Sequence, residues 1–170
     1  MGKGISEGIG PIGEIGANQI VGNLDAGGMR FGIVVARFNA ELTDELCRSA
    51  YRCLTRCGAK PETIDVVRVP GAYEIPVLTE KMAATGRYDA LIALGVVVEG
   101  ETQHAQMIVD ATGKALLDVA CRHRIPVVNE IVGARNWAQA EARCLGGEGS
   151  RGWYAAAAAV ETVSAWRKLG

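Results

Sequence analysis

Three residues suited to anion binding and proton transfer follow one long apolar run in this chain. Residues 91–107 read LIALGVVVEGETQHAQM, in which the apolar run ends at Gly100 and is followed by Glu101, Thr102 and His104. A buried strand, a tight turn and the start of a helix fit this order. Such a turn leaves backbone N–H groups and the positive end of a helix dipole facing an anion such as phosphate. An imidazole titrates near neutrality, so His104 is the side chain best suited to transfer protons there.

Alternating apolar and helical patterns predict the elements that must position this turn. β-branched runs predict strands, and the segments between them show helical spacing. The predicted strands cover residues 31–35, 64–69, 90–98 and 126–132, and the predicted helices cover 41–57, about 75–86, 105–123, 136–144 and 153–169. This order favours an α/β fold in which a four-stranded parallel sheet has helices on both faces. Five consecutive alanines, 155–159, suit close packing of the last helix against another helix.

Polar or aromatic residues stand near the end of each predicted strand. Phe38 and Asn39 follow the first strand, Ala72, Tyr73 and Glu74 follow the second, the turn with His104 follows the third, and Asn129 lies toward the end of the fourth. Ligands of parallel sheets bind beyond the carboxyl ends of the strands. We therefore expect these residues to meet at one cavity. His123, at the end of a predicted helix, is expected to complement the helix dipole.

Composition excludes several other classes of protein. The chain has 170 residues, of which 49% are hydrophobic and 22% charged, and its formal net charge is −1. These values predict one globular domain without a nucleic-acid-binding surface, and no run is long enough to span a membrane. Residues 1–18 form a glycine-rich leader that is expected to be flexible, and 19–170 the single domain. The five cysteines lack CxxC spacing, which favours packed thiols in a reduced, cytoplasmic protein over a metal or redox site.

Several segments together resemble the lumazine synthase family, whose fold is flavodoxin-like. The matching segments are QIVGNL (19–24), FGIVVARFN (31–39), IDVVRVPGAYEIP (64–76), YDALIALGVVVEGETQH (88–104) and RGW with the alanines that follow it (151–159). The resemblance implies condensation of 5-amino-6-ribitylaminouracil with 3,4-dihydroxy-2-butanone 4-phosphate to 6,7-dimethyl-8-ribityllumazine, without a cofactor or metal. It also implies a homo-oligomer with active sites between subunits, either a pentamer or a larger assembly such as a decamer or a 60-subunit shell. The segment 19–24 would then pair with an adjacent subunit's sheet.

The resemblance also implies a role for each matching residue. His104 would transfer protons, and Phe38 would stack on the pyrimidine. The remaining pyrimidine and ribityl contacts would come from Ala72, Tyr73, Glu74, Val96, Val97, Val98 and Asn129. The phosphorylated ketone would be bound by Gly100, Glu101, Thr102 and Arg143.

The chain departs from the family pattern near the fourth strand and beside Gly100. Asn129 and Glu130 replace an aromatic residue and a glycine, Gly133-Ala134-Arg135 replaces a Thr-Thr-acidic turn, and Glu99 replaces a basic residue. Buried polar side chains need partners that the usual substrate would not supply. Two alternatives therefore stay open at this point. One is a paralogue with an altered ligand or reaction, and the other is a non-catalytic shell or scaffold protein.

Overall fold

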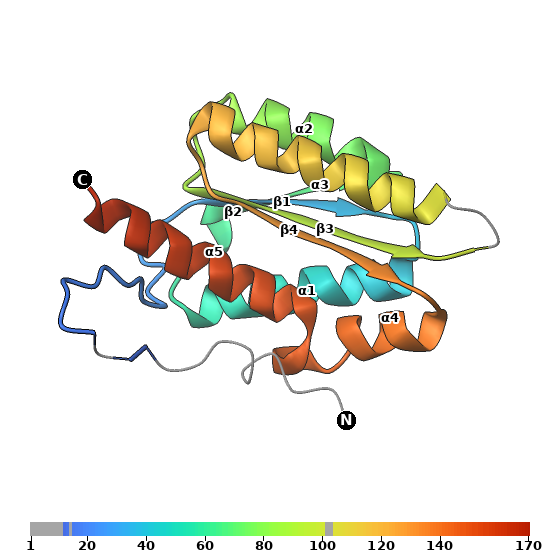
Figure 1. Cartoon of the computed structure of the whole chain (residues 1–170), viewed down its shortest axis with the longest axis horizontal. Coiled ribbons are helices and arrows are strands. Elements are labelled where there is room, and N and C mark those ends of the chain that lie inside the picture. Colours follow the sequence, from blue (N-terminus) through green and yellow to red (C-terminus); the bar gives the residue numbers. More distant parts are fainter. Residues whose placement is uncertain (1–11, 14, 101–103) are drawn as a thin grey trace.

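The computed structural model of the chain, described here for residues 12–13, 15–100 and 104–170, is a four-stranded parallel sheet between two layers of helices (Figure 1). The strands lie in the order β2-β1-β3-β4. Their bounds are β1 (Phe31–Ala36), β2 (Ile64–Val69), β3 (Ala90–Val98) and β4 (Val127–Ala134). The helices are α1 (Ala40–Arg56), α2 (Ile75–Ala83), α3 (His104–His123), α4 (Trp137–Cys144) and α5 (Arg151–Lys168). The predicted α/β class, parallel sheet and two helix layers are confirmed.

The strands pack on both faces, which explains why their sequences lack polar alternation. All six residues of β1 are buried, with α2 and α3 covering one face of the sheet and α1, α4 and α5 covering the other (Figure 1). Burial of each large side chain contributes roughly 1.5–3 kcal/mol, so the central strands stabilise the sheet most. Three short 3₁₀ turns, η2 (Pro61–Thr63), η3 (Ala72–Glu74) and η4 (Gly147–Gly149), complete the connections.

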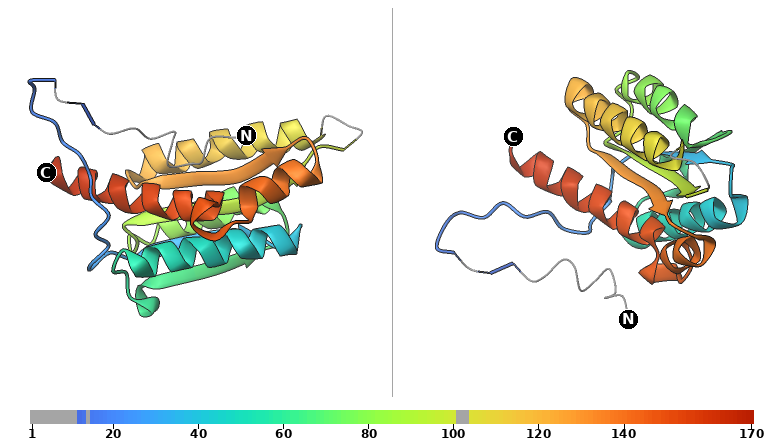
Figure 2. Two further views of the ribbon diagram at one scale, coloured as in Figure 1. Left: turned by 90° about the horizontal axis from the view of Figure 1, so that it is seen from below. Right: turned by 45° about the vertical axis from the view of Figure 1, so that its right-hand side comes forward.

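The alanine-rich helix α5 packs closely against α1, as its composition predicts (Figure 2). Ala155, Ala156 and Ala159 are fully buried. A Cβ atom on Gly152 would lie 2.1 Å from the carbonyl oxygen of Leu46, so only glycine fits this contact. The α1–α5 layer is therefore set by small residues on α5 rather than by large ones.

Before β1, the chain crosses the C-terminal part of α5 at residues 21–23 (Figure 2). The backbone N–H of Asn23 donates to Ser164 Oγ at 3.1 Å, and Lys168 Nζ donates to the carbonyl of Val21 at 2.7 Å. Among residues 12–13 and 15–30, no helix or strand is formed. Residues 1–11 and 14 of the predicted leader lie outside the described residues, so its flexibility stays a prediction.

The feature of the sheet that matters most for a site is the unequal length of its central strands. On one side, β3 pairs with β4 as far as Val98 opposite Ala134. On the other side, its pairing with β1 ends at Leu94 opposite Val35. Since β1 ends at Ala36, one residue later, the last part of β3, from Val96 to Val98, extends past β1. Within the described residues, no helix is long and apolar enough to cross a membrane.

Candidate active site

A cavity of about 430 Å³ lies at the carboxyl ends of β1, β2 and β3, and most of the predicted site residues line it. Its size falls in the range of small-molecule sites. The predicted residues that line it are Phe38, Ala72, Tyr73, Glu74, Val96, Val97, Val98, Gly100 and His104. Glu101 and Thr102 lie outside the described residues. The expectation that strand ends converge on one cavity is thus confirmed for the first three strands.

The turn after β1 fixes Phe38 at the edge of this cavity. Asn39 adopts a left-handed backbone conformation with φ of 57°, and its Nδ2 donates to the carbonyl of Val96 at 3.0 Å. The backbone N–H of Phe38 donates to the carbonyl of Pro70 at 3.0 Å. Asparagine is one of the few residues other than glycine that adopts this conformation at low cost. The Phe38 ring is left 70% exposed, so its face is open to a ligand.

The overhanging end of β3 offers backbone hydrogen-bonding groups to the same cavity. The N–H of Glu99 donates to the carbonyl of Ala134 at 2.8 Å, which places the backbone groups of Glu99 and Val97 on the β4 side. Hydrogen-bonding direction alternates along a strand, so Val96 and Val98 direct theirs to the opposite side, where β1 has already ended. The Val96 carbonyl already accepts the hydrogen bond from Asn39 Nδ2. Among the described residues, none forms a hydrogen bond with the N–H or C=O of Val98 across this open side, so both groups can meet the edge of a planar, hydrogen-bonding ligand.

Glu74 lies at the end of η3 and caps its own turn. The backbone N–H of Gly71 donates to Glu74 Oε2 at 2.8 Å, which holds the carboxylate at the cavity wall. Among the described residues, Oε1 of the same carboxylate accepts no hydrogen bond, so it can accept one from a ligand hydroxyl. The exposed Tyr73 ring stands beside it on the same turn.

His104 is the first residue of α3, and its side chain is exposed at the cavity. Its position at a helix N-terminus brings the imidazole next to the positive end of the helix dipole. A bound anion at that end would lie close to a group able to donate and accept protons. Geometry thus permits the predicted role, which the described residues alone do not test.

Asn129 lies earlier in β4 than the sequence predicted, whereas its predicted contact with the pyrimidine stays a prediction. Asn129 pairs with Ala93, in the middle of β3, and not with the overhanging end. It is exposed, it does not line the cavity, and its Oδ1 accepts the N–H of Ile131 at 3.1 Å. Sequence spacing placed it too near the end because β4 continues to Ala134 rather than 132.

Glu130, the neighbouring departure from the family pattern, has a partner within the chain. Its carboxylate accepts two hydrogen bonds from Arg151, at 2.6 Å from Nε and 2.9 Å from Nη2. Burial raises the pKa of the Glu130 carboxyl, and the Arg151 guanidinium opposes that shift. The argument that a different ligand must satisfy Glu130 therefore fails, because the N-terminus of α5 supplies the cation.

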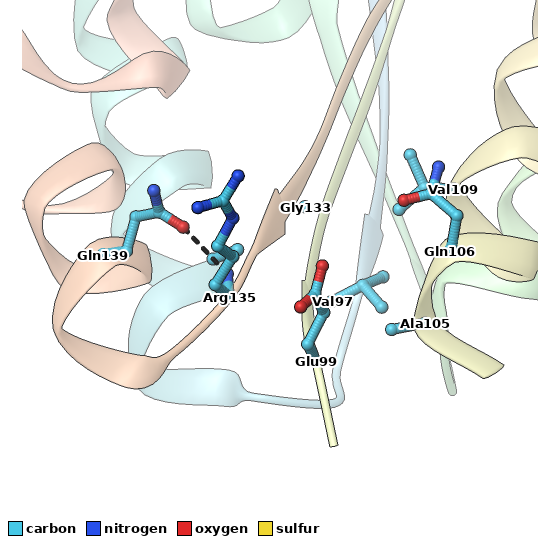
Figure 3. Close-up of a pocket in the computed structure, with 9 residues that line it drawn as sticks. Val97, Glu99, Ala105, Gln106, Val109, Gly133, Arg135 and Gln139 are labelled. Carbon is cyan, nitrogen blue, oxygen red and sulfur yellow. Dashed lines mark hydrogen bonds between the residues drawn. The ribbon is translucent and has the colours of Figure 1, made fainter. Parts of the chain in front are cut away.

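A second, more polar pocket of about 400 Å³ accounts for the two other charged departures (Figure 3). Glu99 and Arg135 both line it, whereas neither lines the cavity with His104. In Figure 3, the backbone N–H of Arg135 donates to Gln139 Oε1, at 2.8 Å. The two pockets adjoin, because Val97 and Ala105 line both, but the Glu99 and Arg135 side chains belong to the second one.

Trp137 is a lining residue that sequence reasoning missed. It is the first residue of α4, lines the cavity with His104, and remains 37% exposed. The pattern that could have indicated it is an aromatic residue in the first turn after the carboxyl end of the fourth strand. Arg143, in contrast, lies in the last turn of α4, exposed and outside the cavity.

Nothing in the described part of the chain resembles a metal centre. No group of three or more His, Cys, Asp or Glu side chains is close enough there to hold an ion. Burial raises the pKa of the Cys53 and Cys144 thiols to about 12, so both stay protonated and unreactive near neutrality. The residues that do line the cavity offer hydrogen bonding, stacking and proton transfer.

Comparison with known proteins identifies the family to which this cavity belongs. A sequence model of 6,7-dimethyl-8-ribityllumazine synthase matches residues 28–167. The chain belongs to the lumazine synthase family. A 6,7-dimethyl-8-ribityllumazine synthase from Desulfatibacillum aliphaticivorans is 43% identical over 146 residues, which are 86% of this chain and 94% of that protein. Proteins of the same name from Chlorobaculum parvum and Xylella fastidiosa are 38% and 40% identical, covering 89% and 87% of this chain and 97% and 96% of their own.

Membership of the lumazine synthase family confirms the resemblance that the sequence motifs indicated. The matched range includes every strand and every cavity residue named above. The individual roles of His104, Phe38, Glu74 and Arg143 in this chain stay predictions, and they are taken up as proposals below.

Proposed function

We propose that this chain is a transferase of riboflavin biosynthesis that condenses 5-amino-6-ribitylaminouracil with 3,4-dihydroxy-2-butanone 4-phosphate to form 6,7-dimethyl-8-ribityllumazine. Membership of the lumazine synthase family supports the reaction. The observation that carries the assignment to this site is the cavity where the overhanging end of β3, the exposed Phe38 ring and His104 meet. A planar pyrimidine with donors and acceptors at its edge complements these three features.

Each group in the cavity has a task in this reaction. The pyrimidine stacks on Phe38 and hydrogen-bonds the Val98 backbone, while ribityl hydroxyls donate to Glu74 Oε1. The amine attacks the ketone and one water is lost as the imine forms. Phosphate then leaves, and a second water is lost as the other amine closes the ring. His104 moves the protons between these steps. Holding both substrates together supplies much of the acceleration.

The phosphate site of this proposal is completed by a second subunit. Arg143 lies outside its own chain's cavity and is exposed on α4, so it is available to a neighbouring copy. We therefore place Arg143 at the neighbour's phosphorylated ketone within a homo-oligomer, a pentamer or a shell built from pentamers. The positive end of α3 beside His104 supplies the first part of the anion site.

Fluorescence of the product tests the activity directly. Purified protein incubated with both substrates is expected to form fluorescent lumazine, with formation dependent on both compounds. Absence of product from well-folded protein would contradict the assignment. Light scattering on the same sample measures the assembly size, and a monomer would contradict the shared site.

Mixed oligomers test the sharing of sites between subunits. His104→Ala and Arg143→Ala proteins are each expected to be nearly inactive. When the two are unfolded together and reassembled, some sites combine an intact His104 from one subunit with an intact Arg143 from its neighbour, and activity returns. If both residues served the same subunit's site, the mixture would stay inactive.

A further inference from the structure

Trp137 occupies a fixed position at the edge of the cavity. Asn136 caps α4, because its Oδ1 accepts the backbone N–H of Gln139 at 2.9 Å. The Gln139 side chain in turn accepts the backbone N–H of Arg135 at 2.8 Å (Figure 3). Both hydrogen bonds join a residue before Trp137 to Gln139, which follows it. They hold the first turn of the helix against the end of β4. The indole is thus presented by a rigid turn.

Register brings this turn to the overhanging part of β3. Ala134, the last residue of β4, pairs with Val98, the last residue of β3. Trp137 follows three positions later and lines the same cavity as Phe38 and His104. Two aromatic residues, one after β1 and one after β4, therefore line one cavity, and Val98 lines it with them.

An indole left 37% exposed at a cavity is a surface that a flat ligand can cover. Aromatic rings attract one another in offset or edge-to-face arrangements, beyond the effect of the area they bury. The exposed 70% of Phe38 offers the same chemistry from another element. The phosphorylated ketone is aliphatic and has no ring, so stacking on Trp137 or Phe38 would add little to its binding.

We infer that Trp137 is a specificity-determining residue, whose indole contacts the heteroaromatic ring of the pyrimidine substrate and so discriminates it from non-aromatic compounds. This inference rests on the proposed function for the identity of the ring. Trp137 does not take part in proton transfer. Its effect falls on the binding of one substrate and not of the other.

Replacement of Trp137 by Phe and by Leu separates stacking from space filling, since both residues are apolar and of comparable size but only Phe keeps a ring. Trp137→Leu is expected to raise KM for the pyrimidine about tenfold, the range of single aromatic–base contacts. Trp137→Phe is expected to keep most of the affinity. KM for the butanone phosphate and kcat should stay near their original values in both.

Trp166, exposed on α5, supplies matched controls through the same two substitutions. Trp166→Leu and Trp166→Phe should leave both KM values unchanged, and light scattering should show that all four variants keep the assembly of the original protein. Equal pyrimidine KM values for Trp137→Leu and Trp137→Phe, or equal losses for both substrates, would overturn the inference.

Calorimetry with the pyrimidine alone keeps this inference separate from the proposed reaction. If the original protein forms no lumazine yet Trp137→Leu weakens pyrimidine binding about tenfold, the reaction assignment fails and the role of Trp137 stands. If turnover occurs and Trp137→Leu binds the pyrimidine as tightly as the original protein, the role of Trp137 fails and the reaction stands.

Discussion

The amino and carboxyl ends of the strands differ in what their polar and aromatic side chains contact. At the amino ends, Tyr88 Oη donates to Asp65 Oδ2 at 2.7 Å, and Asp89 accepts from the Arg30 backbone and from Arg167 at 2.7 and 2.8 Å. At the carboxyl ends, Phe38 and Tyr73 are 70% and 60% exposed, and β3 extends past its neighbour. The first set contacts other parts of the chain, and the second faces a cavity.

This difference shows how one sheet separates stability from binding. Hydrogen bonds within the chain gain about 1 kcal/mol each and need fixed partners. Groups that will contact a ligand must instead be left without such partners until it binds. Variants at the amino ends should therefore change the free energy of unfolding, and variants at the cavity should change kinetics.

The Glu130–Arg151 pair is an exception to this comparison. It lies toward the cavity half of the molecule, yet its hydrogen bonds are made within the chain. Arg151→Ala would leave the Glu130 carboxyl buried without its cation, at a cost of about 3 kcal/mol in the free energy of unfolding. Urea denaturation measures this loss. The double variant Glu130→Leu with Arg151→Met should recover most of it, and equal stability of single and double variants would show that the pair is dispensable.

His104→Ala tests the cavity end of the comparison. We expect turnover to fall about 10²-fold, because proton transfer loses its group, while assembly size and melting temperature stay unchanged. Steady-state kinetics and calorimetric melting on one preparation provide both values. Unchanged turnover would remove His104 from the mechanism, and a lower melting temperature would make it a structural residue instead.

Tyr88→Phe tests the amino end. The substitution removes the hydrogen bond to Asp65 from a side chain that is only 9% exposed, so the free energy of unfolding should fall by about 1 kcal/mol. The kcat should not change below the melting transition. Tyr51→Phe, at an exposed position on α1, is the matched control and should leave stability unaltered. A kinetic effect of Tyr88→Phe without a loss of stability would reverse the comparison.

The smallest expected effect concerns pH and the contact between the C-terminal ends of α2 and α3. His123 Nε2 lies 2.7 Å from Glu80 Oε1, and this contact, with Arg122, lowers the pKa of the Glu80 carboxyl. A lowered pKa contributes stability above the unfolded value near 4.5, and that contribution is lost as pH falls through the folded pKa.

Glu80→Gln should therefore cost at most about 1 kcal/mol at neutral pH and nothing at strongly acidic pH. Melting temperatures of both proteins across acidic and neutral pH measure the difference. If the two melting temperatures still differ at a pH where the Glu80 carboxyl is protonated, the effect comes from packing rather than charge. His123 was expected to complement the helix dipole, and the structure adds a carboxylate partner on α2.

The fold was predictable from sequence because its strands are apolar without alternation and each is followed by a helical pattern. Leu42, Leu46, Ala50 and Leu54, spaced four apart, are all buried. The first three strand ends were placed correctly because short polar turns mark where a buried strand must stop.

The rest depended on contacts between residues distant in sequence. Sequence periodicity cannot show that Arg151 forms hydrogen bonds with Glu130, or that Glu99 and Arg135 line a second pocket rather than the cavity with His104. Asn129 was misplaced because nothing in an apolar run states how far the strand continues, and Trp137 was missed because its place depends on the register of β4 with β3.

The early end of β1 has a consequence for ligand shape. A pyrimidine bound against Val98 would lie where the next residues of β1 would otherwise have continued the ladder. The ligand then acts as a replacement for a missing piece of strand, flat like a peptide group and with donors and acceptors along one side. An insertion that lengthened β1 by two residues would close the site without altering any side chain in it.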